Sequence, residues 1–151
     1  MNKLLTSILL LILSIAANSQ VMDPVKWSYS AKKIADKTYE VHLTASIQPN
    51  WHLYSQQQPD DAIAIPTSIR FNKNPLVLIN GEIKESGKLE HFKDEKLKLS
   101  ANQYSGKVDF VQVVKLKATA KTNITGSIEY QTCDDKKCLP PKTVNFSVAL
   151  N

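Results

Sequence analysis

Cysteine is scarce in this sequence: its 151 residues include only two. Two cysteines form at most one disulfide, which excludes the multi-disulfide frameworks of small secreted domains. Two ligands also cannot complete a tetrahedral structural zinc site. The chain is long enough for one domain and short for two. With 22% charged residues it does not have the composition of a chain that is disordered throughout.

Arginine is almost absent as well, since Arg70 is the single arginine among the 19 basic residues. Proteins that read nucleic acid use arginine for bidentate contacts to bases and phosphates. The formal net charge of +5 is therefore better explained by a solvated, lysine-rich surface. We expect no nucleic-acid partner.

The first 19 residues have the pattern of a secretory signal peptide, which leaves residues 20–151 as a single mature domain. Lys3 gives a positive start, the run from Leu4 to Ala16 is mainly apolar, and Ala17-Asn18-Ser19 offers small residues for cleavage. An uncleaved anchor is the alternative, but the run is short for a bilayer span of about 20 residues. We expect a periplasmic or secreted protein without a membrane span after cleavage. A close cysteine pair is expected to be oxidised there.

Alternation of apolar and polar residues with a period of two dominates the mature chain. It is clearest in residues 38–47, 124–131 and 143–150, where one face of each strand would be buried and the other would face water. Residues 108–116 are partly apolar on both faces, which indicates a central strand. Shorter strands are expected at residues 25–30, 69–71 and 76–79.

Prolines and glycines separate these strands, and no helical pattern in the mature part exceeds two turns. Short strands with frequent turns are typical of an all-β fold, an antiparallel β-sandwich of roughly seven to nine strands. A small antiparallel barrel is the alternative.

The most informative segment holds both cysteines. Cys133 ends one expected strand, and Cys138 precedes the next after four polar residues. The strands should form a hairpin with the thiols at its mouth, where Cα atoms can approach to the roughly 4.4–6.8 Å that a disulfide needs. A loop of six residues gains only about 2 kcal/mol from the crosslink, against nearly 5 kcal/mol for about a hundred residues. Thiol exchange, a local structural crosslink and soft-metal binding with His52 or His91 remain open.

The pattern Tyr130-Gln131-x-Cys133-x4-Cys138-Leu139-Pro140-Pro141 resembles the amino-terminal periplasmic domain of DsbD-type thiol:disulfide interchange proteins. The segment Asn50-Trp51-His52-Leu53-Tyr54 is similar to an aromatic-rich segment of that family. The resemblance covers about residues 22–150. It implies an immunoglobulin-like sandwich with an inserted cap and active-site loop region, and it implies that Cys133 and Cys138 are the working dithiol.

The same resemblance implies a cap and a set of partners. Residues 89–95 best match the loop that covers the disulfide, with Phe92 as the shield beside Glu90 and His91, while Trp51 and Tyr54 would help form a docking surface. The partners would be a thioredoxin-like or membrane-embedded thiol reductase and oxidised periplasmic proteins. We expect no cofactor and no metal.

Two departures from the family pattern and several alternatives accompany this interpretation. Four residues separate the cysteines instead of five, and Phe92 stands without the Phe-Tyr pair of the family's cap. Phe92, Trp51 and Tyr54 are ordinary core or rim aromatics in the alternative interpretation. The competing function is an exported immunoglobulin-like binding or adaptor module with a purely structural disulfide. The chain shows no membrane or thioredoxin-like module of its own, so we expect these on separate polypeptides.

Overall fold

The structure is a computed structural model that describes residues 22–62, 64–95 and 98–151. The expected signal peptide lies outside the described residues. The described chain contains nine strands and no helix: β1 (Val25–Ala35), β2 (Thr38–Ile47), β3 (His52–Tyr54), β4 (Ser68–Phe71), β5 (Val77–Asp94), β6 (Leu99–Leu116), β7 (Thr122–Tyr130), β8 (Thr132–Cys133) and β9 (Lys142–Leu150). Within these ranges there is accordingly no helix that could span a membrane.

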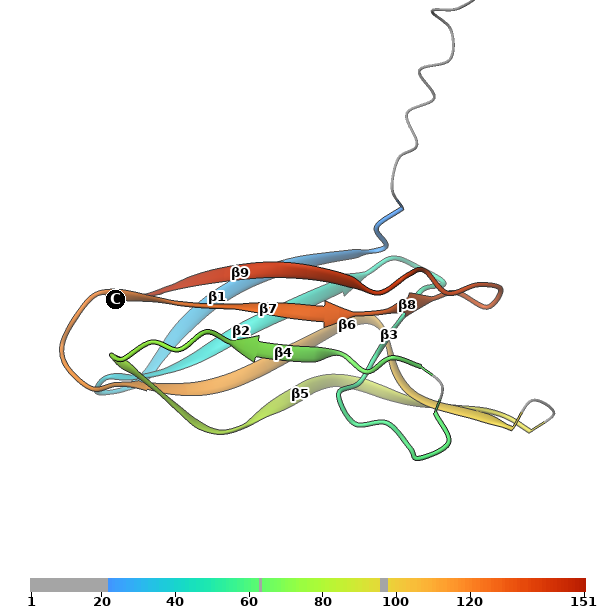
Figure 1. Cartoon of the computed structure of the whole chain (residues 1–151), viewed down its shortest axis with the longest axis horizontal. Helices are drawn as coiled ribbons and strands as arrows, with labels where there is room; N and C mark the ends of the chain where they lie inside the picture. The colour runs from blue at the N-terminus through green and yellow to red at the C-terminus, as the bar shows by residue number, and fades with distance from the viewer. Residues whose placement is uncertain (1–21, 63, 96–97) are drawn as a thin grey trace, which may run out of the picture.

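The strands form two antiparallel sheets that pack face to face (Figure 1). One sheet has six strands in the order β1-β2-β6-β3-β8, with β5 also paired to β6. The other has three strands in the order β4-β7-β9. This is the antiparallel sandwich that the strand pattern predicts and, as the family resemblance implies, it is immunoglobulin-like; the alternative of a closed barrel is wrong.

The sandwich core follows directly from the alternation in the sequence. The inward side chains of β2 are buried, and Val41, Leu43 and Ala45 are fully inaccessible to solvent. They belong to one apolar cluster with side chains from β7 and β9, among them Ile128 and Phe146. Burying one such large apolar side chain contributes about 1.5–3 kcal/mol. The strands predicted at 38–47, 124–131 and 143–150 are confirmed.

Strand β6 is central, as the apolar pattern of residues 108–116 predicts. It pairs with β2 along one side and with β5 along the other. Gln112 lies on β6 and is only 2% exposed, so its amide needs partners inside the protein. Its Nε2 donates to the carbonyl of Asn80 at 3.0 Å, at the irregularity of β5 that contains Gly81 with φ +72°.

Strands β5 and β6 are longer than the sequence predicts, because their pairing continues from residues 89–94 to residues 99–104. The segment 89–95 was expected to be a loop, whereas 89–94 is the distal part of β5. We call residues 88–95 and 98–105 the arm. The arm extends from the sandwich at the same end of the molecule as the cysteine loop (Figure 1). Its residues are mainly exposed on β5, so the burial pattern that marks the other strands is missing there.

The chain changes sheets just before the first cysteine. The pairing of β7 with β9 ends at Tyr130 and Lys142. Thr132 and Cys133 then form β8, which pairs with β3 in the six-stranded sheet, so that Cys133 lies opposite His52. The hairpin predicted around the cysteines therefore spans both layers of the sandwich.

Candidate functional site

Cys133 and Cys138 form a disulfide, with Cα atoms 4.0 Å apart. They are an isolated antiparallel pair flanked by two backbone hydrogen bonds, from Leu139 N to Thr132 O and from Asp134 N to Lys137 O, both 2.9 Å. Such a pair is non-hydrogen-bonded itself, and at these positions the two side chains of a ladder come closest. The sequence-predicted thiols at a hairpin mouth are thereby confirmed, slightly closer together than the expected range.

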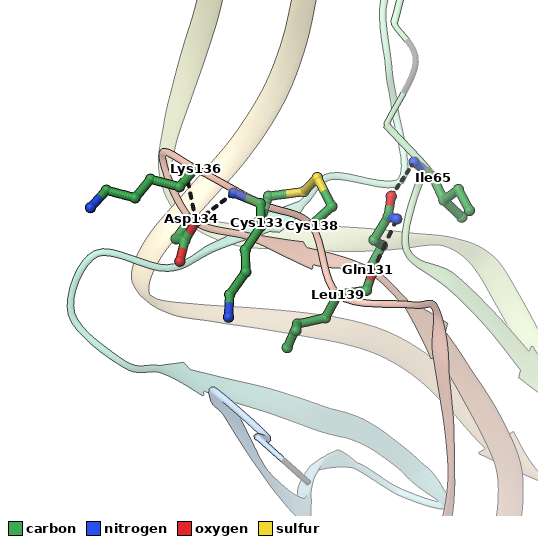
Figure 2. Close-up of a disulfide and its surroundings, with 8 residues drawn as sticks. Ile65, Gln131, Cys133, Asp134, Lys136, Cys138 and Leu139 are labelled. Atoms are coloured by element: carbon green, nitrogen blue, oxygen red, sulfur yellow. Dashed lines mark hydrogen bonds between the residues drawn. A yellow bond between two sulfur atoms is a disulfide. The ribbon is translucent and has the colours of Figure 1, made fainter.

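Asp134 closes the turn between the cysteines. Its Oδ1 accepts hydrogen bonds from the backbone N–H groups of Lys136, at 2.8 Å, and Lys137, at 2.7 Å (Figure 2). These two bonds favour the ionised carboxylate and lower the pKa of Asp134 below its ordinary value of 3.8. The turn is therefore held by a charge that is present at neutral pH.

The two cysteines differ in exposure. Cys133 is 5% exposed and packs in a small apolar cluster with Tyr54 and Ala101, separate from the sandwich core. Cys138 is exposed. The sequence does not choose between them as the point of attack, whereas the structure presents Cys138 to solvent and keeps Cys133 inside.

Gln131 fixes the base of the cysteine loop. Its Oε1 accepts a hydrogen bond from Ile65 N at 3.1 Å, and its Nε2 donates to Leu139 O at 3.3 Å (Figure 2). The side chain therefore connects the segment before β4 to the chain after Cys138. Gln131 belongs to the cysteine motif, but the sequence alone assigns it no role; its place two residues before Cys133 is the available signal.

The segment of residues 55–67, between β3 and β4, is tied to the arm by polar contacts. Asn102 O accepts a hydrogen bond from Ser55 N at 3.0 Å and another from Gln58 Nε2 at 2.7 Å. Gln58 Oε1 accepts one in return from Asn102 N at 3.0 Å. Ser100 Oγ donates to Asp61 Oδ1. These contacts tie residues 55–61 to the arm.

Glu85 anchors the start of the same segment. Its carboxylate accepts hydrogen bonds from Ser55 Oγ, Gln56 N and Tyr104 OH, each at 2.7 Å. Burial and the Glu85 carboxylate raise the pKa of Tyr104, so this phenol remains a hydrogen-bond donor at neutral pH. Glu85 thus links β5, β6 and the chain that follows β3.

A groove of about 630 Å³ lies beside the disulfide. It is bounded by strands β3, β5, β6 and β8 and by the segment of residues 55–67. We call it the disulfide groove, and its lining residues are His52, Tyr54, Ala64, Phe92, Asp94, Leu99, Ser100, Ala101, Gln103, Gln131, Cys133, Asp134, Asp135 and Cys138. The structure therefore brings Phe92 and Tyr54 together with both cysteines.

The register of the arm separates the expected cap residues. Phe92 lies opposite Ala101, and Glu90 lies opposite Gln103, so both belong to the face that carries the groove. Phe92 is 47% exposed and is not a core residue, and Glu90 accepts a hydrogen bond from Ser105 Oγ at 3.0 Å. His91 points to the other face, with its Nδ1 2.7 Å from Asn102 Oδ1, and does not line the groove.

The two aromatics expected to form a docking surface, Tyr54 and Trp51, lie in different parts of the structure. Tyr54 lines the groove, and burial raises its pKa, which keeps the phenol protonated. Trp51 packs in the sandwich core at 8% exposure and does not line the groove. His52 shares the groove with the cysteines. In the part of the chain that the structure describes, no group of three or more His, Cys, Asp or Glu side chains is arranged to hold a metal ion.

Comparison with known proteins places this geometry in context. The family model described as "Thiol:disulfide interchange protein DsbD, N-terminal" matches residues 19–150. A search of curated proteins gives no match.

Three solved structures share the fold. The reduced DsbD N-terminal domain of Neisseria meningitidis is 15% identical with a TM-score of 0.55, over 90% of this chain and 95% of that chain. The DsbD N-terminal domain in complex with the PilB N-terminal domain, from the same organism, is 16% identical with a TM-score of 0.52, over 85% and 88%. The N-terminal periplasmic domain of ScsB from Proteus mirabilis is 15% identical with a TM-score of 0.50, over 83% and 44%.

Proposed function

The chain belongs to the family of DsbD N-terminal domains, thiol:disulfide interchange modules, and from this premise we propose an electron route. The domain takes electrons from a thioredoxin-like or membrane-embedded reductase and passes them to oxidised periplasmic proteins through Cys133 and Cys138. The observation that carries the proposal is a disulfide with one buried and one exposed cysteine at the edge of an open groove.

Exposure assigns different roles to the two sulfurs. A thiolate of the reduced partner attacks Sγ of Cys138, the S–S bond breaks, and Cys133 leaves as a thiolate that takes a proton from water. The partner's second thiolate then attacks the partner sulfur of the mixed disulfide and releases Cys138. Two electrons have moved to this domain, and the partner has become a disulfide.

The second half of the cycle runs in the opposite sense. Cys138, as the exposed thiolate, attacks the disulfide of an oxidised protein and forms a mixed disulfide with it. Cys133 then attacks Sγ of Cys138, which restores the disulfide of this domain and releases the reduced substrate. The 4.0 Å separation of the two Cα atoms keeps Cys133 within reach of the mixed disulfide throughout.

A thioredoxin-like protein is the partner best supported. A DsbD N-terminal domain of the same fold forms a complex with the PilB N-terminal domain. A partner that brings a dithiol to Cys138 would cover the disulfide groove, because Cys138 lines it.

Residues around the groove have proposed roles in docking. Phe92 shields the disulfide from small thiols and moves aside when a partner docks, with Glu90 steadied by Ser105 beside it. Tyr54 packs under the partner. Trp51 supports the docking surface indirectly, because it packs in the core next to β3. His91 also acts indirectly: it contacts Asn102, and Asn102 donates a hydrogen bond to Gln57 O in the segment that follows β3. The chain is proposed to reach the periplasm through its signal peptide.

Trapping tests the route. A Cys133→Ser variant keeps the exposed Cys138 and lacks the resolving thiol. Mixed with a thioredoxin whose second active-site cysteine is replaced by serine and whose first is activated as a disulfide with thionitrobenzoate, it should accumulate a mixed disulfide that mass spectrometry locates on Cys138. Cys138→Ser is the matched control and should trap little, because Cys133 is buried. Equal trapping by both variants would contradict the assignment, and no trapping with preserved fold would favour a structural disulfide.

A further inference from the structure

Gln103 is a buried side chain in the disulfide groove whose amide has no hydrogen-bond partner among the described residues. It is 8% exposed, and it lines the groove together with both cysteines. Among the described residues, Trp27 Nε1 is the one side-chain N or O that is both buried and unpartnered, so the amide atoms of Gln103 reach the groove although most of the side chain is buried. The groove is open, so water can satisfy this amide while the protein is free.

Gln112 shows what a structural glutamine on the same strand looks like. It is 2% exposed, and its Nε2 donates to carbonyl oxygens of Asn80 and Val113, both at 3.0 Å. Gln112 therefore serves the fold. Gln103 sits on the same strand at similar burial without such bonds, so the packing of the protein itself does not account for it.

The register places the Gln103 amide at a defined point of the groove. Gln103 lies opposite Tyr54 of β3 on one side and opposite Glu90 of β5 on the other. Tyr54, Ala101 and Phe92 give the groove apolar walls around it. A partner that covers these walls expels the water from the amide. An amide left unpaired in this way would weaken docking by about 5- to 150-fold, so a partner that binds well must supply hydrogen bonds.

We propose that Gln103 is a specificity-determining residue that hydrogen-bonds a main-chain peptide group of the docked thioredoxin-like partner. A carboxamide has one acceptor oxygen and a donor NH₂ group in one plane, which matches the C=O and N–H of a peptide. Every partner segment offers such groups whatever its side chains, which suits a protein that exchanges with more than one partner. This inference rests on the proposed function.

The position of Gln103 also locates the recognised peptide group. Strand β3 lies between β8, which carries Cys133, and β6, which carries Gln103. Cys138 lies one pairing further out, with its Cα 4.0 Å from that of Cys133, so two strand spacings and this pairing give about 14 Å, which an extended chain covers in at least about four residues. The recognised peptide group is therefore about four to five residues from the partner cysteine that attacks Cys138.

The test compares Gln103→Met with Gln112→Met, because methionine keeps the length of glutamine and removes its hydrogen bonds. The oxidised variants are reduced by thioredoxin kept reduced with its reductase and NADPH, while the concentration of the variant is changed. Gln103→Met should raise the KM roughly tenfold with kcat unchanged. Its rate of reduction by dithiothreitol and its melting temperature should match the wild type. Gln112→Met should lower the melting temperature and leave the KM unchanged.

The KM and the melting temperature of Gln103→Met together decide whether Gln103 serves docking or the fold. An unchanged KM for Gln103→Met overturns the inference, and so does a melting temperature that falls as in Gln112→Met, since the residue would then serve the fold. Gln103→Glu, which keeps an acceptor and loses the donors, provides a second variant and should raise the KM as well. If thioredoxin fails to reduce even the wild-type protein while dithiothreitol succeeds, the proposed function fails and this inference falls with it.

Discussion

The sandwich core and the cysteine end of this protein are held together in different ways. The core is one cluster of buried apolar residues that both sheets share. The cluster at the cysteine end consists of Tyr54, Ala101 and Cys133, with Ala64 packed against it. The rest of that end is held by hydrogen bonds of Gln131, Asn102 and Glu85 and by a disulfide that closes a short loop.

This difference suits a protein whose disulfide must open and close. A disulfide that closes a loop of six residues contributes only about 2 kcal/mol, so its reduction removes little of the stability of the fold. The core lies in the body of the sandwich and contains neither cysteine, so we expect the same core packing in both redox states. The cysteine end can therefore change its bonding while the sandwich stays folded.

The largest expected effect on stability comes from the core. Leu43 is fully buried on β2, and Leu43→Ala removes apolar contacts and leaves a cavity. The free energy of unfolding should fall by about 2–5 kcal/mol. Chemical denaturation measures this loss. The reduction potential of the disulfide should stay at the wild-type value, and a shift that follows the lost stability would show that the two regions are not independent.

A smaller effect is expected from the polar anchor. Glu85→Gln replaces a carboxylate that accepts three hydrogen bonds by a neutral amide, which weakens them by about 1–2 kcal/mol in total. Hydrogen exchange should increase in the segment of residues 55–67 and remain unchanged in β2 and β7. Glu82→Gln, an exposed position on the same strand, is the control. Faster exchange spread evenly over both sheets would contradict a local anchor.

The smallest effect on stability is expected at the tip of the arm. Phe92→Ala removes an exposed ring from the wall of the groove, so the melting temperature should hardly change. Reduction by dithiothreitol should become several-fold faster, because the disulfide loses its shield. Leu89→Ala is the matched control, since Leu89 is 40% exposed on the same strand and does not line the groove. Equal rates for Phe92→Ala and the wild type would discard the cap.

The sequence predicts the core better than the cysteine end, for a physical reason. Apolar and polar residues alternate in residues 38–47 and 143–150 because one face of each strand packs against the other sheet. The period of two is therefore visible in the sequence. The distal part of β5 has no such layer behind it, so residues 89–94 read as a loop although they are paired. Strand β8 is two residues long, which is too short to show any period.

The site shows the same division. The motif around Cys133 and Cys138 predicts the disulfide and its place at a hairpin mouth. The crossing of the chain to the other sheet decides which cysteine is buried, and that depends on the pairing with β3 far along the chain. The face on which His91 points depends on the register between β5 and β6. Gln103 escapes sequence reasoning because its missing partners are visible only in three dimensions.

The reduction potential of the Cys133–Cys138 pair tests the central claim most directly. Equilibration of the protein with glutathione or thioredoxin buffers, with alkylation of free thiols and mass spectrometry, gives the value. An exchanging disulfide that a thioredoxin-like partner can reduce should lie above about −270 mV. A potential below about −300 mV would identify an inert structural crosslink and would contradict the account of this protein as an electron carrier.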